Sequence, residues 1–374
     1  MAAAHLDHRV AVTRAHVATL YADALLVTHA PNVAWLTGFF SSSSALILTK
    51  SAIVVLTDFR YQESLARMEA AGALPSGTRP EIVEGSLDTA AVAILEQLDC
   101  DAIAIEAEHM SVRRFGRLQS LVSKGTHLIQ AEAFMERLRA EKDAVEIGIY
   151  REAAARLARA AARLPALVEP GRQEREVGAL IDLELKRAGF DRTAFETIVA
   201  SGPNSALPHA RPTSRVLAAG DAVVLDFGGV YAGYCVDLTR TGFIGHPPES
   251  FLRLFEAVTE AQAAAIGAVR AGMHAGEVDG TARQVLAARG LDRAFGHATG
   301  HGLGIDVHEF PRIGRPTPDA EDPVLRDGMI VTIEPGVYVP GLGGVRIEDD
   351  VLVCADGAEV LTDIPRGLMT LGAR

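Results

Sequence analysis

The strongest constraint on the fold comes from a stretch that reads as two apolar strands joined by a tight turn. Residues 221–241, DAVVLDFGGVYAGYCVDLTRT, place valine, leucine and phenylalanine on both sides of that turn. Pairing about Tyr231 and Ala232 would put Asp226 on one strand directly opposite Asp237 on the other. Such a hairpin brings two carboxylates together in apolar surroundings.

A second stretch repeats this pattern near the end of the chain. Residues 329–353, MIVTIEPGVYVPGLGGVRIEDDVLV, again contain two apolar strands, here around a turn centred on Gly341. The same pairing rule puts Glu334 opposite Glu348. Bulges at the glycines could shift either register.

Four carboxylates in apolar strands need a source of positive charge. Directly opposed residues have Cβ atoms roughly 4.5–5.5 Å apart, and like charges at that separation are destabilising. Two divalent cations would balance the four negative charges and would present a bridging water as hydroxide. With His301 as a nitrogen donor, the set suits Mn²⁺, Co²⁺, Fe²⁺ or Zn²⁺. The alternative, acids that flank turns on a solvated face, is disfavoured by the Val, Ile and Leu residues at alternate positions.

A glycine-rich run supplies that histidine. In residues 297–309, HATGHGLGIDVHE, His297, His301 and His308 are interspersed with glycines. Glycines cannot fill a core, so the run is suited to close approach of the backbone to a bound group. A lone histidine is usually a satisfied core or surface group, but three in a chain with two carboxylate hairpins indicate a functional site.

One arginine is placed to support the carboxylates. Arg346 lies two residues before Glu348 and therefore on the same strand face. It could hydrogen-bond to a bridging carboxylate and orient it. The alternative is an ordinary surface arginine.

Charge and hydrophobicity exclude two classes of partner. The formal net charge is −12, so the chain lacks the basic surface that a nucleic acid needs. No apolar run reaches the 18 or so residues of a membrane span, and the N-terminal residues do not resemble a signal peptide. The three cysteines, Cys100, Cys235 and Cys354, form no CxxC pair. These features predict a cytoplasmic protein.

The chain changes character near residues 135–142. Before this point short apolar strands alternate with helical stretches, which predicts an α/β domain over residues 1–138. A charged helical segment, the hairpins and the histidine run then follow in a second domain, residues 139–374. The fold class is therefore α/β with α+β character. Asn32–Phe40, NVAWLTGFF, is interpreted as an apolar loop that is buried or reaches across an interface.

Five motifs together resemble the pita-bread metallopeptidases, the family of methionine aminopeptidase, aminopeptidase P, prolidase and the metal-free creatinase. The motifs are SGPNSALPH (201–209), DFGGVYAGYCVDLTRT (226–241), HATGHGLGIDVHE (297–309), TIEPGVY (332–338) and GGVRIEDD (343–350). The resemblance covers nearly the whole chain and is closest to the branch that cleaves Xaa-Pro bonds. It implies a creatinase-like N-terminal α/β domain followed by a pita-bread catalytic domain.

The resemblance also implies a ligand set for two divalent ions per subunit, with Mn²⁺ expected and Co²⁺ or Zn²⁺ as alternatives. Asp237 and Glu348 would bridge both ions. Asp226 would bind one ion, and His301 with Glu334 would bind the other. Glu334 would also carry a proton to the leaving proline nitrogen. Creatinase and non-catalytic binding relatives lose ligands, whereas this sequence keeps all five, so an enzyme is expected.

Further residues are implied as substrate contacts. His209, His297 and His308 match histidines that bind substrate and stabilise the tetrahedral intermediate. In relatives the NVAWLTGF stretch reaches towards the partner's active site in a homodimer. The resemblance therefore implies a homodimer and makes Trp35 and Phe39 candidate substrate contacts.

The choice between dipeptidase and aminopeptidase P depends on the proline carboxylate. A dipeptidase must anchor that charge, and arginine does so with paired hydrogen bonds. Arg312, four residues after His308, matches an arginine used in this way in prolidases of similar length. The expected substrates are therefore Xaa-Pro dipeptides, and Arg346 is a second candidate contact. The alternatives are a loop arginine facing water, a small aminopeptidase P that cleaves longer peptides, and, more remotely, a non-catalytic binding protein.

Overall fold

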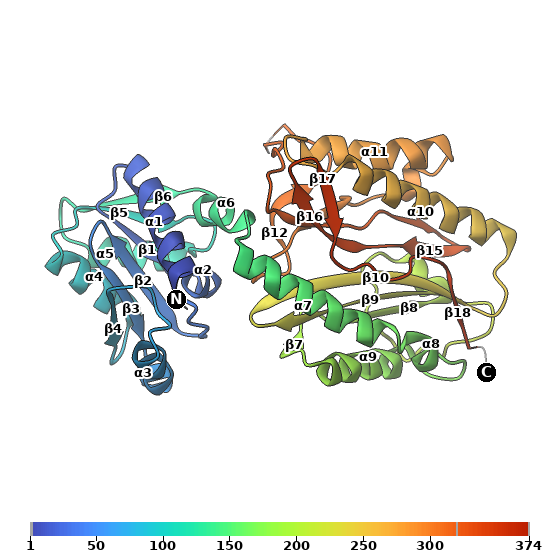
Figure 1. Cartoon of the computed structure of the whole chain (residues 1–374), viewed down its shortest axis with the longest axis horizontal. Helices are drawn as coiled ribbons and strands as arrows, with labels where there is room; N and C mark the ends of the chain where they lie inside the picture. The colour runs from blue at the N-terminus through green and yellow to red at the C-terminus, as the bar shows by residue number, and fades with distance from the viewer. Residues whose placement is uncertain (1–2, 319–320, 373–374) are drawn as a thin grey trace. The chain divides into compact units, whose positions relative to one another are not determined.

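The chain, for which we use a computed structural model, is described over residues 3–318 and 321–372 (Figure 1). It divides into two compact units between Arg139 and Ala140. Each unit has its own sheets and its own cluster of buried apolar side chains. The mixed α/β class expected from the sequence is confirmed.

A six-stranded sheet forms the centre of the N-terminal unit, in the order β4-β3-β2-β1-β5-β6. Strands β1, β2 and β3 are buried at every position, as expected for a sheet covered on both faces. The strands are β1 (Ala24–Val27), β2 (Ser44–Thr49), β3 (Ile53–Thr57), β4 (Thr78–Ile82), β5 (Ala102–Glu106) and β6 (His127–Ala131). The helices are α1 (Ala4–Thr19), α2 (Ala30–Thr37), η1 (Phe59–Tyr61), α3 (Gln62–Ala70), α4 (Leu87–Gln97), α5 (Val112–Leu121) and α6 (Phe134–Ala140).

Helix α2 occupies most of the stretch Asn32–Phe40, so the prediction of a loop there is wrong. Pro31 in the first turn is preorganised for a helix, and Gly38, with φ of +71°, ends it in the left-handed conformation. The Glu106 carboxylate accepts a hydrogen bond from the N–H of His29 (2.9 Å), the residue that precedes the helix. Because the helix is apolar nearly all round, it lacks the periodic pattern that reveals an amphipathic helix.

The two aromatic residues expected to contact substrate lie in the core of the N-terminal unit. Trp35 is 4% exposed, and the Arg9 guanidinium lies 5.2 Å from its ring centre. Phe39 is 1% exposed and packs edge-on against Tyr61, with 5.9 Å between ring centres. Phe40 instead reaches the surface and is 48% exposed. Trp35 on α2 and Phe39 just after it are thus both buried within this unit, in line with the buried alternative, and their contact with substrate stays a prediction.

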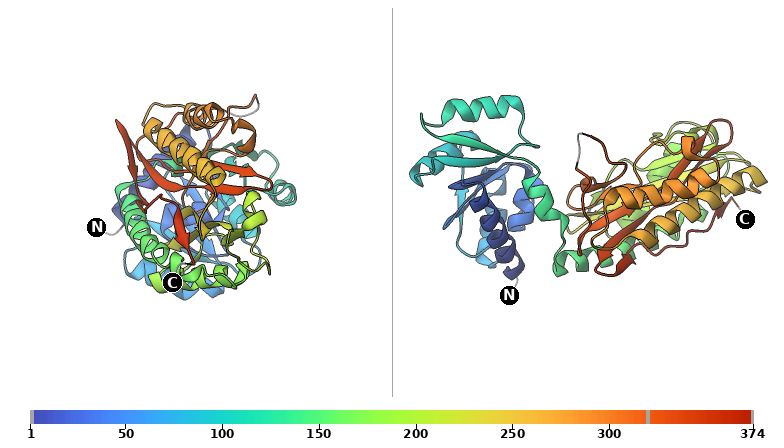
Figure 2. Two further views of the ribbon diagram at one scale, coloured as in Figure 1. Left: turned by 90° about the vertical axis from the view of Figure 1, so that its right-hand side faces the viewer. Right: turned by 90° about the horizontal axis from the view of Figure 1, so that it is seen from above.

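Two sheets form the centre of the C-terminal unit, and a pair of helices covers each sheet. One sheet has the order β18-β10-β9-β7, with β8 also paired to β9, and the other has the order β12-β11-β13-β16-β17. Helices α7 and α9 pack on the first sheet. Helices α10 and α11 lie side by side and cover the second (Figures 1 and 2). Strand β10 contacts β16, so the uncovered faces of the two sheets meet in the interior.

The boundaries of these elements follow in chain order. The helices are α7 (Ala144–Ala161), α8 (Leu164–Leu167), α9 (Glu174–Ala188), η2 (Gly202–Ala206), α10 (Glu249–Ala268), α11 (Ala275–Ala288) and η3 (Asp292–Ala294). The strands of the first sheet are β7 (Arg192–Thr193), β8 (Ile198–Ser201), β9 (Ala222–Tyr231), β10 (Tyr234–Ile244) and β18 (Met369–Leu371). The remaining strands are β11 (Gly300–Gly302), β12 (Glu309–Ile313), β13 (Ile330–Ile333), β14 (Gly336–Val339), β15 (Gly343–Arg346), β16 (Asp349–Cys354) and β17 (Gly357–Val360).

The hairpin of β9 and β10 has a different register from the predicted one. Its turn is Ala232-Gly233, one residue further along than the centre inferred from the sequence, with φ of +48° and +87°. Positive φ at both turn residues suits the twist of a two-residue hairpin. Asp226 therefore lies opposite Thr239, and Asp237 lies opposite Gly228. The two aspartates are diagonal neighbours on one face of the sheet rather than a directly opposed pair.

The predicted opposition of Glu334 and Glu348 is confirmed. The two residues lie between the β13–β16 pair of strands and the β14–β15 pair, and both pairs have the same register. Ile333 pairs with Asp349 on one side, and β14 with β15 continues the same register on the other. The two glutamates thus face each other where the chain crosses from one ladder to the next.

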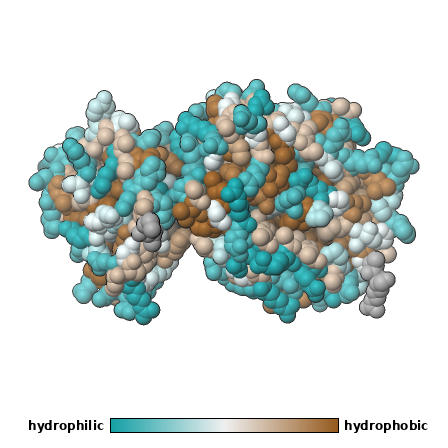
Figure 3. All heavy atoms as spheres, in the orientation of Figure 1, coloured by the Kyte–Doolittle hydropathy of each residue, from teal (hydrophilic) through white to brown (hydrophobic). Residues whose placement is uncertain are grey.

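The surface of the C-terminal unit is mixed. Hydrophilic residues cover most of the periphery of the face shown in Figure 3, with hydrophobic patches between them. Among the residues that the structure describes, no helix combines the length and apolar character needed to cross a membrane.

Candidate active site

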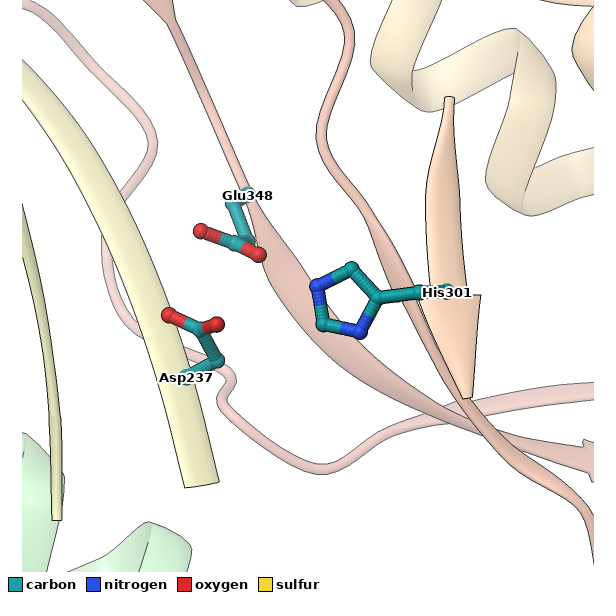
Figure 4. A group of neighbouring side chains, drawn as sticks. All are labelled: Asp237, His301 and Glu348. Atoms are coloured by element: carbon teal, nitrogen blue, oxygen red, sulfur yellow. The ribbon is translucent and has the colours of Figure 1, made fainter. Parts of the chain in front are cut away.

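Three side chains from three strand regions converge in the C-terminal unit. Asp237 projects from β10, His301 from β11, and Glu348 from the link between β15 and β16. Their potential ligand atoms all lie within 4.8 Å of one another, and the side chains point towards a common centre (Figure 4). A metal ion could be held between them.

The other two predicted ligands flank this group. The Glu334 Oε1 atom lies 3.7 Å from His301 Nε2. The Asp226 Oδ2 atom accepts a hydrogen bond of 2.5 Å from Arg346 Nη2. All five predicted ligands line one cavity of about 270 Å³, so the structure brings the complete set together.

Burial dominates the electrostatics of this group. Burial raises the pKa of Asp237 and of Glu348 well above the usual carboxyl range, and negatively charged neighbours add to the effect. Burial also raises the pKa of Glu334 to about 8, although Arg346 acts in the opposite direction. Burial lowers the pKa of His301 to about 4, so its imidazole is neutral at pH 7 and keeps a lone pair for a ligand.

The donor atoms fit divalent cations. The Oδ1 atoms of Asp226 and Asp237 are buried and accept no hydrogen bond from the described residues. A buried oxygen without a partner costs free energy, and a bound cation would remove that cost. Four carboxylates and one imidazole form the oxygen-rich set that Mn²⁺ and related ions accept.

Arg346 is a buried member of the site rather than a surface arginine. It is 3% exposed. Its guanidinium donates to Asp226, to the Tyr338 hydroxyl (2.7 Å) and to the carbonyl of Pro208 (3.0 Å). The carboxylate that it orients is therefore Asp226, and not one of the two expected to bridge. Asp226 approaches Arg346 from the opposite sheet. The sequence of the Arg346 hairpin alone shows only which residues share a strand face, so it could not indicate this partner.

Two contributing residues were missed by the sequence reasoning. The Thr239 hydroxyl donates to Glu348 Oε2 (2.6 Å) and accepts from Arg346 Nε (3.1 Å). The Tyr338 hydroxyl lies 3.1 Å from His297 Nε2. Thr239 follows Asp237 by two residues on β10, so the two-residue period of a strand could have identified it. Tyr338 lies on β14, beyond the break in the strand after Glu334, and no such period indicates it.

The predicted substrate histidines line a second cavity that adjoins the first. This cavity is about 320 Å³, and its lining includes His209, His297, His308 and Arg312. His209 and His308 also line the first cavity, so the two form lobes of one cleft. The rings of His301 and His308 meet edge to face, with 4.2 Å between centres.

Burial sets the charge state of two of these histidines. It lowers the pKa of His297 to about 4, with a further contribution from Arg346. It also lowers the pKa of His308, to which His209 contributes. Both imidazoles are therefore mainly neutral at pH 7 and carry one N–H each. His297 uses its own to donate from Nδ1 to the Ala298 carbonyl (2.8 Å), which leaves Nε2 as the acceptor facing the Tyr338 hydroxyl.

Comparison with known proteins identifies the family. Residues 148–355 match the model of metallopeptidase family M24, and residues 9–140 match that of the creatinase/prolidase N-terminal domain. The chain belongs to metallopeptidase family M24. The resemblance to pita-bread metallopeptidases is thereby confirmed, and so is the implied order of a creatinase-type domain followed by a pita-bread domain.

Several M24 relatives match over nearly the whole chain. The Xaa-Pro dipeptidase of Pyrococcus horikoshii is 32% identical over 359 residues, which cover 93% of this chain and 94% of the relative. The solved Xaa-Pro dipeptidase of Bacillus anthracis superposes with a TM-score of 0.91 at 31% identity, covering 98% and 100% of the two chains. The X-Pro aminopeptidase of Thermotoga maritima superposes with a TM-score of 0.85 at 30% identity, covering 95% and 99%. The expectation of a metallopeptidase is confirmed.

Proposed function

We propose that this chain hydrolyses the Xaa-Pro peptide bond, and that its preferred substrates are dipeptides. The observation that carries the proposal is the convergence of Asp237, His301 and Glu348, with Asp226 and Glu334 beside them, in one cleft. Two divalent ions held by these five residues would supply Lewis acidity and a nucleophile that is active at neutral pH.

The ligand roles proposed here are those that the resemblance to the pita-bread metallopeptidases implies. Asp237 and Glu348 are two of the three residues whose ligand atoms converge, and they would be shared by both ions. Asp226 would complete one site, and His301 with Glu334 would complete the other. The hydrogen bonds from Arg346 to Asp226 and from Thr239 to Glu348 fix one oxygen of each carboxylate and leave the second free for an ion.

The histidines and Glu334 would act on the peptide itself. His209 and His308 line the cleft as hydrogen-bond donors to the substrate carbonyl and to the negative charge that develops on it. His297, whose Nδ1 donates to the Ala298 carbonyl, would contact the substrate with the exposed edge of its ring. The nitrogen of an Xaa-Pro bond carries no hydrogen, so it must gain a proton to leave. We assign that proton transfer to the Glu334 carboxyl group.

Arg312 supports the preference for dipeptides. It lines the lobe that also contains His297, and no carboxylate of the described residues pairs with it. Its Nη1 atom reaches only the Arg315 carbonyl, at 3.5 Å. In the other lobe, by contrast, Arg211 already pairs with Glu196 at 3.2 Å. An arginine fork without an acidic partner can bind the carboxylate of a C-terminal proline.

We also propose Mn²⁺ as the bound ion, with Co²⁺ or Zn²⁺ as alternatives, because oxygen donors predominate in the ligand set. A cytoplasmic location is supported by the three cysteines, all of which are free thiols. A homodimer is proposed from the resemblance to the Xaa-Pro-cleaving branch alone.

A direct assay tests the proposed function. The purified chain with Mn²⁺ is expected to hydrolyse Ala-Pro with a higher kcat/KM than Ala-Pro-Ala, and EDTA should abolish both activities. Release of the N-terminal alanine from both peptides can be followed by chromatography. A higher kcat/KM for the tripeptide would favour the aminopeptidase alternative, which the similarity to the Thermotoga maritima enzyme represents. No hydrolysis of either peptide would contradict the proposal.

Replacement of Arg312 by alanine tests the carboxylate anchor. The KM for Ala-Pro is expected to rise about 10- to 100-fold, because hydrogen bonds to charged groups contribute about 1.5–3 kcal/mol each. The KM for Ala-Pro-Ala should change much less, since its proline carboxylate is absent. Arg315→Ala, which alters an exposed arginine three residues away, is the control. Equal effects of Arg312→Ala on both substrates would contradict the anchoring role.

A further inference from the structure

A buried ion pair on α11 lies behind the wall of the cleft. Asp279 and Arg283 are one helical turn apart, and the Arg283 Nε and Nη2 atoms donate to the two carboxylate oxygens at 2.6 and 3.0 Å. Their side chains are only 1% and 16% exposed. Exposed pairs at this spacing are common on helices, but a buried one has to satisfy every donor and acceptor that it brings inside.

The remaining donors of Arg283 hold the segment that carries His297. Nη2 donates to the His297 carbonyl at 2.6 Å, and Nη1 donates to the Phe295 carbonyl at 3.1 Å. The guanidinium also lies over the Phe295 ring, 4.2 Å from its centre. That ring in turn meets the His297 imidazole edge-on, with 5.0 Å between centres. The Arg283 side chain thus holds the backbone on both sides of Gly296, and it also packs on the Phe295 ring that contacts His297.

Asp279 holds the other end of the same segment. Its Oδ1 atom accepts hydrogen bonds from the Thr299 hydroxyl (2.8 Å) and backbone N–H (3.2 Å). The Thr299 carbonyl then accepts from the N–H of Glu334 (2.7 Å). The ion pair is therefore connected by main-chain hydrogen bonds to two cleft residues, His297 and Glu334, although neither Asp279 nor Arg283 lines the cleft itself.

We propose that Asp279 and Arg283 are positioning residues that set the place of His297 in the substrate cleft. Residues 295–299 lie between η3 and β11 and belong to no helix or strand, so no regular ladder fixes their backbone. The ion pair supplies that restraint through two carbonyls, one hydroxyl and one N–H. This inference rests on the proposed function, in which His297 contacts the substrate.

A double-mutant cycle tests the proposal. Arg283→Met is expected to raise the KM for Ala-Pro about tenfold, the scale of effects of groups that orient a functional residue, with a smaller change in kcat. The same substitution made in His297→Ala protein should add almost nothing, because Arg283 acts through His297. Arg283→Lys keeps one charged donor and should recover part of the loss. Additive effects of Arg283→Met and His297→Ala would overturn the proposal.

Hydrogen exchange provides a readout that does not depend on activity. Arg283→Met is expected to increase deuterium uptake over residues 295–299, and unchanged uptake there would overturn the positioning role. Should Arg283→Met not fold, Asp279→Asn, which keeps the shape of the carboxylate, replaces it in both measurements. Arg253→Met is the matched control, because Arg253 pairs with Glu249 at the same helical spacing but is 63% exposed. Wild-type protein that cleaves no Xaa-Pro peptide would contradict the proposed function, while the exchange result would still decide the positioning role.

Discussion

Asp237→Asn protein is expected to lose Xaa-Pro hydrolysis by about a thousandfold or more, because a metal-assisted reaction takes several kcal/mol of transition-state stabilisation from its ions. Asp237 is one of the three residues whose potential ligand atoms converge, and its Oδ1 atom accepts no hydrogen bond from the described residues. The amide that replaces it carries no charge and is a poor ligand for Mn²⁺. Metal content measured by plasma mass spectrometry should fall together with activity.

The same substitution should have the opposite effect on the metal-free protein. With EDTA present, Asp237→Asn is expected to melt at a higher temperature than the wild type, because it removes a buried acid beside Glu348. Mn²⁺ should raise the Tm of the wild type but not of the variant. Asp182→Asn, on α9, is the control, because that carboxylate accepts a hydrogen bond from Thr197 and does not line the cleft. Full metal binding by Asp237→Asn protein would refute the central ligand assignment.

Metal-free protein is expected to lose stability as the pH rises from 6.5 to 8. Burial raises the folded-state pKa of Glu334 from its usual 4.5 to about 8, and raises those of Asp237 and Glu348 as well. A carboxyl group with a raised folded pKa is protonated in the folded state when the unfolded chain has already lost that proton. Its contribution to stability is complete below the unfolded pKa and disappears as the pH rises through the folded pKa.

The buried histidines limit the pH range in which the change in stability reports the carboxyl groups alone. Burial lowers the pKa of His301 and of His297 to about 4. Each of them therefore destabilises the fold as the pH falls below the unfolded value of about 6.5. In the unfolded chain these imidazoles finish losing their protons only at about pH 7.5, so below that pH they add a small opposing gain in stability. Above about pH 7.5 they are neutral in both states, and the slope reports the buried carboxyls.

Urea unfolding at pH 6.5, 7, 7.5 and 8, with EDTA or with Mn²⁺, would measure this effect. Mn²⁺ should remove or reverse the slope, because ligand carboxylates bind the ion only when deprotonated. Glu334→Gln protein in EDTA should show a shallower slope than the wild type, since one titrating group has been removed. Identical slopes for Glu334→Gln and wild type would show that Glu334 does not titrate in this window.

The sequence predicted the second hairpin better than the first for a local reason. The turn at Gly341 is symmetrical about one residue, so the opposition of Glu334 and Glu348 followed directly. In the first hairpin the turn falls at Ala232-Gly233, and alanine seldom adopts the positive φ that this turn requires. Placing the turn one residue earlier was therefore the natural error. Both aspartates nevertheless stayed on one face, because the shift moves the partner of each by two residues.

Other features depend on contacts between distant segments and could not be predicted from local patterns. Arg346 forms its hydrogen bond with Asp226 because the two sheets face each other. No residue in the strand that carries Arg346 indicates this partner. Asp279 and Arg283 read as an ordinary helical pair until the 295–299 segment is placed against α11. Helix α2 was missed because its sequence is apolar nearly all round and so lacks an amphipathic period.

The five proposed ligands are distributed over both sheets of the C-terminal unit, and this distribution affects how the protein matures. Asp226 and Asp237 belong to the first sheet, whereas His301, Glu334 and Glu348 belong to strands of the second or to the links beside them. With the ligand set proposed above, neither sheet alone supplies all five residues, so full metal affinity would develop only once the two layers have docked. In a maturing chain, metal binding would therefore follow the docking of the two sheets rather than precede it.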